Sequence, residues 1–84
     1  MLDVHEKIQS VVRGAYLKYG QFTSTHEAYG VLAEEVAELL DEIRANNRDG
    51  VINEAIDVAA VATRLAIAAA YCAIPFHRRS GFDG

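Results

Sequence analysis

The chain has 84 residues, 51% of them apolar and 24% charged, a balance that excludes a disordered protein and allows one small domain. The formal net charge of −4 gives no electrostatic reason to bind nucleic acid. A single cysteine and a polar N-terminus without a signal-peptide pattern indicate a cytoplasmic protein that has no internal disulfide.

The first predicted helix covers about residues 4–18. Asp3 and Glu6 form a start that resembles a capping box, apolar residues then recur at helical spacing, and Gly20 closes the segment. We expect this helix mainly to cover the apolar face of the two helices that follow.

A second helix is predicted over about residues 25–45, opened by a capping box of Ser24 and Glu27. Glu35 and Glu38 lie at about 60° and 120° from the centre of its predicted core stripe, so we expect this pair between core and solvent. The stripe consists of five apolar residues: Ala28, Leu32, Val36, Leu39 and Ile43.

The third predicted helix starts between Arg48 and Val51 and ends before Pro75, because the residue ahead of a proline avoids the helical conformation. It is apolar nearly all round, yet we do not expect it to span a membrane. Arg64 would cost about 2.5–3.5 kcal/mol inside a bilayer, and the many alanines supply little apolar area. Its surplus apolar face therefore predicts self-association.

The predicted fold class is all-α. Three main helices form one domain over residues 1–75, and residues 76–84, with two glycines and no periodicity, form a flexible tail. The second and third helices make an antiparallel hairpin, which oligomerisation to a dimer or tetramer completes into a helical bundle.

Two pairs of carboxylates stand out on the hairpin. Glu35 and Glu38 share one flank of the second helix, and Glu54 and Asp57 share one flank of the third. The midpoint of these four positions falls at residue 46, in the polar turn, so the pairs meet when the hairpin closes. Charges about 5 Å apart repel by roughly 3 kcal/mol at an effective dielectric of 20. The all-oxygen set therefore predicts Mg²⁺, with Mn²⁺ as the alternative ion; the competing interpretation is two solvated acidic faces.

The run Glu34-Glu35-x-x-Glu38, followed after fifteen residues by Glu54-x-x-Asp57, resembles the signature of the MazG-like nucleotide pyrophosphohydrolases, specifically the short single-domain members. The resemblance implies hydrolysis of a nucleoside triphosphate to the monophosphate and pyrophosphate, to remove unwanted nucleotides. By position it implies that Glu35, Glu38, Glu54 and Asp57 hold Mg²⁺. Glu34 would be a further ligand or the base for the attacking water, so Glu34, Glu35 and Glu38 are the predicted catalytic residues; an ordinary surface role is the alternative for Glu34.

Arg64 departs from the family pattern, because larger members often have Asn at this position, seven residues after the motif Asp. We predict that Arg64 binds a substrate phosphate, the alternative being a salt bridge to an acidic residue of a neighbouring helix or subunit. His26 is the second predicted substrate contact, with a surface or capping role as its alternative. A non-catalytic module that binds a nucleotide or a partner and keeps the metal site is the competing function.

Overall fold

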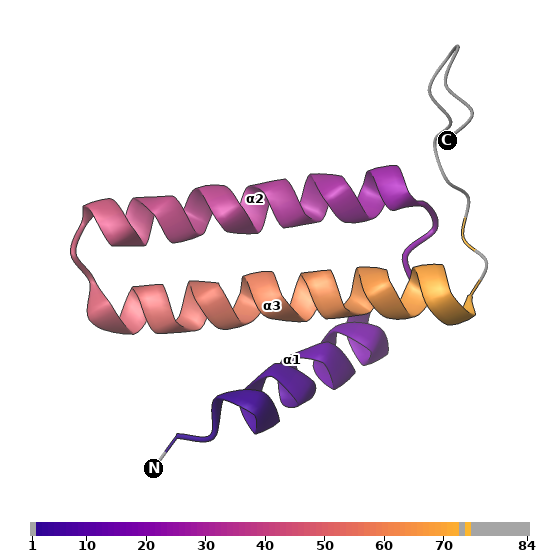
Figure 1. Cartoon of the computed structure of the whole chain (residues 1–84), viewed down its shortest axis with the longest axis horizontal. Helices are drawn as coiled ribbons and strands as arrows, with labels where there is room; N and C mark the ends of the chain where they lie inside the picture. Colours follow the sequence, from indigo (N-terminus) through magenta and orange to yellow (C-terminus); the bar gives the residue numbers. More distant parts are fainter. Residues whose placement is uncertain (1, 73, 75–84) are drawn as a thin grey trace.

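The computed structural model describes residues 2–72 and 74 and shows three helices (Figure 1). They are α1 (Val4–Tyr19), α2 (Thr25–Arg44) and α3 (Arg48–Tyr71). No strand occurs in this part of the chain, which confirms the all-α prediction. The predicted tail at 76–84 lies outside the described residues.

Side-chain caps fix where α1 and α2 begin. The Asp3 carboxylate accepts a hydrogen bond from the Glu6 amide at 3.1 Å, and the Ser24 hydroxyl accepts one from the Glu27 amide at 3.0 Å. The Glu27 carboxylate in turn accepts hydrogen bonds from the backbone amide and the hydroxyl of Thr23. Helix starts were therefore predictable from short-range chemistry.

The turn between α2 and α3 is centred where the sequence predicted it. Asn46 has a positive φ of 55°, and the Asn47 side chain caps α3 by accepting from the Gly50 amide at 3.2 Å. A side chain at position 50 would collide with the Glu42 carboxylate, so glycine lets that carboxylate approach the positive end of α3. The two helices run antiparallel and side by side (Figure 1).

The face of α2 that is covered differs from the predicted stripe. Val36 and Ile43, predicted to lie in the core, are 48% and 53% exposed. The apolar arc of this helix is too wide for one partner, and the side that becomes covered is the one that includes Glu35. From Ala28 onward, the covered positions are Ala28, Val31, Leu32, Glu35, Leu39 and Glu42.

An uncovered apolar stripe remains on α2, centred about 100° round the helix from Ala28. Its members alternate at spacings of four and three residues, the pattern of a helix-pairing seam. We call it the α2 stripe; it comprises Tyr29, Ala33, Val36, Leu40 and Ile43. The surplus apolar face was predicted on the third helix, but among the described residues Tyr71 is the only large apolar side chain exposed on α3.

Helix α1 packs obliquely against α3 and makes no contact with α2, so it does not cover both helices of the hairpin as predicted (Figure 1). The hydrophobic core lies near the α1–α2 connector, where Phe22, Ala28 and Val61 are buried together. This arrangement leaves space between α1 and α2, and that space borders the acidic residues. None of the three helices is long and apolar enough to cross a membrane in the part of the chain described.

Candidate metal centre

Three of the four predicted ligands meet in the middle of the hairpin. One carboxylate oxygen each from Glu35, Glu38 and Glu54 lies within 4.8 Å of the other two. Two of these side chains come from α2 and the third from α3, so only the folded hairpin brings them together. Glu35 and Glu54 are half-buried, whereas Glu38 is exposed. We call these three residues the carboxylate cluster.

Asp57 borders the carboxylate cluster without joining it. It is half-buried one turn after Glu54, and its pKa is raised first by burial and then by the charge of Glu38. The structure thus places the fourth predicted ligand within electrostatic reach of the cluster and gathers only the other three at ligand spacing.

Burial and mutual repulsion act on the cluster in the same direction. Burial, followed by the charges of Glu38, Asp57 and Glu54, raises the pKa of Glu35 from its ordinary 4.5 to about 7. Burial and Glu38 also raise the pKa of Glu54. One buried oxygen each of Glu35 and Glu54 has no hydrogen-bond partner. The cluster therefore resists full ionisation and keeps unused acceptors.

The donor set fits a small, hard divalent cation. Mg²⁺ holds oxygens at about 2.1 Å in octahedral geometry, which separates opposite ligands by about 4.2 Å. The three oxygens lie within 4.8 Å of one another, so they must approach one another to bind such an ion directly. The all-oxygen donor set could hold a hard divalent cation, and the predicted identity of the ion, Mg²⁺ or Mn²⁺, stays a prediction.

Arg64 is buried, with only 5% of its surface exposed. Its guanidinium lies 4.2 Å from the ring centre of Phe22 and 5.4 Å from that of Tyr16, and it donates to the Gly20 carbonyl at 3.1 Å. Its Nε has no hydrogen-bond partner. No carboxylate in the described chain forms an ion pair with it, so the alternative of a salt bridge to a neighbouring helix finds no support there.

Two adjoining cavities, of about 340 and 190 Å³, are lined by residues of α1, the α1–α2 connector, α2 and α3. They share Tyr19, Val31, Glu35 and Arg64, so we treat them as one cleft, the α1 cleft. Because Glu35 belongs to both the cleft and the carboxylate cluster, a ligand in the cleft would lie next to a bound metal ion. The remaining lining residues are Val11, Ala15, Gln21, Phe22, Glu27, Glu34, Asp57, Ala60 and Val61.

Two further predicted residues differ in their relation to this cleft. Glu34 is exposed but lines the cleft beside Glu35, so it is not simply a surface residue on the far side of α2. His26 is exposed in the first turn of α2 and is not among the residues that line the cleft. Its predicted contact with substrate stays a prediction.

The sequence did not single out Tyr19 or Gln21, which form part of the cleft wall. Both flank Gly20, whose positive φ of 73° ends α1 and turns the chain toward α2. The only signal in the sequence was their position next to a helix-ending glycine, which locates a connector but does not show what the connector faces.

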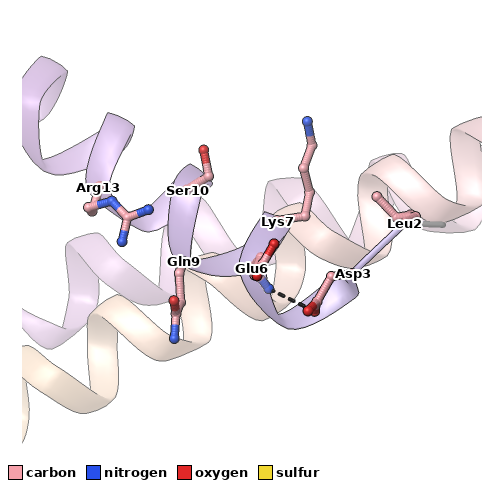
Figure 2. Close-up of a pocket in the computed structure, with 7 residues that line it drawn as sticks. All are labelled: Leu2, Asp3, Glu6, Lys7, Gln9, Ser10 and Arg13. Carbon is pink, nitrogen blue, oxygen red and sulfur yellow. Dashed lines mark hydrogen bonds between the residues drawn. The ribbon is translucent and has the colours of Figure 1, made fainter.

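A broader depression of about 560 Å³ lies on the N-terminal half of α1 and just before it (Figure 2). Figure 2 shows side chains that diverge from α1 and from the two residues before it, and the one hydrogen bond drawn among them is donated by the Glu6 amide to the Asp3 carboxylate. No cluster of buried polar atoms converges there, so this surface does not resemble a ligand site.

Comparison with known proteins adds no identification: no family model, no curated protein and no solved structure matches this chain. The resemblance to the MazG-like enzymes therefore depends on the acidic motif and its spacing. Independently of that resemblance, the geometry defines an all-α hairpin with a candidate divalent-metal site beside a cleft.

Proposed function

We propose that this protein is a cytoplasmic, Mg²⁺-dependent nucleoside triphosphate pyrophosphohydrolase that removes unwanted nucleotides. The observation that supports it best is the carboxylate cluster, with three carboxylate oxygens from two antiparallel helices within 4.8 Å. In a helical protein that bound no ion, such a site would only lower stability, through charge repulsion and unpartnered acceptors.

Glu35, Glu38 and Glu54 would hold the metal ion, with Asp57 moving in as a further ligand. When bound, the ion supplies charge neutralisation for a polyphosphate and acidifies a coordinated water. Glu34, at the edge of the cleft, accepts the proton of the attacking water in this scheme. Water attacks the α-phosphorus and its bond to the α–β bridging oxygen breaks, so that pyrophosphate leaves with that oxygen.

Arg64 would contribute its guanidinium. The residue borders the same cleft as Glu35, and its buried Nε–H has no hydrogen-bond partner. A phosphate oxygen held between the metal ion and Arg64 would give the buried guanidinium a negative partner, which it does not have in the described chain.

The α2 stripe supports self-association, with a second copy of this chain as the partner. Val36, Leu40 and Ile43 are 42–53% exposed, and the alternating spacing suits packing against another helix. The stripe is centred about 120° round α2 from Glu35. A partner on this face would therefore leave the carboxylate cluster and the cleft open to substrate.

A pyrophosphate-release assay against the common NTPs and dNTPs, with Mg²⁺ or Mn²⁺, tests the catalytic proposal. Glu54→Gln should reduce turnover by at least about 100-fold, since it removes a metal ligand. Asp41→Asn, an exposed charge on α2 outside the cluster, is the matched control and should keep full turnover. Tight metal and nucleotide binding with triphosphate left intact would favour the non-catalytic binding module.

A further inference from the structure

The α1 cleft continues directly from the carboxylate cluster, since Glu35 lines both. A nucleotide whose phosphates meet a metal ion at the cluster must place its sugar and base a few ångströms away. The cleft is the adjoining space in the described chain, and its larger cavity of about 340 Å³ is within the range of small-molecule sites.

The walls of the cleft suit a flat ring. Apolar side chains of α1, α2 and α3 line its inner part, including Val11, Val31 and Val61. Tyr19 borders both cavities and keeps 69% of its surface exposed. The Lys18 ammonium lies 5.1 Å from the centre of its ring, which leaves the other face of the ring to stack on a heterocycle. The ring of Phe22 is already engaged, because Arg64 lies over it at 4.2 Å.

The outer part of the cleft carries hydrogen-bond acceptors. Glu27 is held in place, because one of its oxygens accepts from the Thr23 amide at 2.7 Å and from the Thr23 hydroxyl at 3.1 Å. Glu27 and Glu34 both border the cleft. Carboxylates accept hydrogen bonds and donate none, so they favour a ligand edge that carries N–H groups.

We propose that the α1 cleft binds the nucleobase of the substrate and selects cytosine and adenine, whose exocyclic amino groups occupy corresponding positions. That amino group can donate to Glu27, whereas uracil, thymine and guanine present a carbonyl at the corresponding position, which a carboxylate repels. The base stacks on Tyr19, and the Arg64 guanidinium donates to an oxygen of the phosphate chain. This inference rests on the proposed function for the position of the phosphates.

Binding measured without turnover tests it. The wild-type protein is titrated calorimetrically in Mg²⁺ with the α,β-methylene analogues of CTP and UTP and with inorganic triphosphate. The two bases differ in that cytosine carries an amino group and an unprotonated N3, whereas uracil carries a carbonyl and an N3–H. We expect the CTP analogue to bind about tenfold more tightly than the UTP analogue. Glu27→Gln introduces an amide N–H donor at the same place, so it should reduce the ratio of the two affinities toward one.

Tyr19→Ala should weaken both nucleotide analogues about tenfold and leave inorganic triphosphate unchanged. Leu17→Ala is the matched control, since Leu17 lies on the same turn of α1, is 90% exposed and borders neither cavity. Circular dichroism confirms that each variant is folded before titration.

Equal affinity for the CTP and UTP analogues, or an unchanged affinity in Tyr19→Ala, overturns the base assignment. If inorganic triphosphate still binds with Mg²⁺ in that case, the proposed function stands and only the assignment of the base fails. If neither inorganic triphosphate nor any nucleotide binds, the proposed function fails together with the base assignment.

Discussion

The charge balance of the carboxylate cluster predicts how stability responds to pH. Glu35 has a pKa of about 7 in the fold against an ordinary 4.5, so the folded chain holds this proton more tightly than the unfolded chain does. The resulting stabilisation is complete below about pH 4.5 and is lost as the pH rises through 7. Glu54 and Asp57, whose pKa values are also raised, add to the loss in the same direction.

The size of this change in stability follows from the shift in the pKa of Glu35. A shift from 4.5 to about 7 corresponds to about 3 kcal/mol when each pH unit counts for about 1.4 kcal/mol. Glu35 is only half-buried and therefore partly screened by solvent, which reduces the expected loss between pH 5 and pH 8 to about 1–3 kcal/mol. A divalent cation at 100 times its dissociation constant should return about 2.7 kcal/mol at pH 8.

Urea unfolding followed by far-ultraviolet circular dichroism measures this directly. Curves are recorded at pH 5, 6, 7 and 8 with chelator, and again at pH 8 with Mg²⁺ or Mn²⁺. Glu35→Gln should reduce the pH slope to the share of Glu54 and Asp57 and should remove most of the metal response. Glu34→Gln, the exposed neighbour outside the cluster, should keep the pH slope.

The reasoning fails if the free energy of unfolding of the metal-free protein is constant or rises between pH 5 and pH 8. It fails equally if Glu35→Gln has the same slope as the wild-type chain. All other side chains are common to the three proteins, so the difference between wild type and variants isolates the substituted carboxylate.

Three further predictions concern packing and caps. Arg64→Ala should lower the free energy of unfolding by about 2 kcal/mol in a urea titration, because both ring contacts and the hydrogen bond to the Gly20 carbonyl are lost. Arg64→Met should stay closer to the wild-type stability but should lose affinity for triphosphate. Ser24→Ala should cost about 1 kcal/mol in the same assay through loss of the α2 cap, and no change would mean that another group caps the helix. Leu40→Glu should convert an oligomer into a monomer in sedimentation velocity, whereas Leu17→Glu should not; a wild-type chain that sediments as a monomer contradicts the role of the α2 stripe.

Much of the site could be predicted from the sequence because its determinants are local. The i, i+3 spacing of Glu35 and Glu38 fixes their shared flank on one helix, and a turn at residue 46 brings Glu54 opposite them. Asp57 satisfied the same spacing rule, yet it is not part of the group of three. Spacing sets the direction in which a side chain leaves a helix, whereas the crossing of the two helices decides which oxygens meet.

The amino-acid sequence by itself determined where the helices begin and the all-α class, since caps and the turn at Asn46 act over a few residues. Only the tertiary structure decided which side of α2 is covered, because two apolar faces of similar character compete for one partner helix. The same packing placed the Arg64 side chain against the rings of Tyr16 and Phe22 and left the cleft beside α1 open. These outcomes depend on contacts between residues far apart in the chain, which spacing along one helix does not encode.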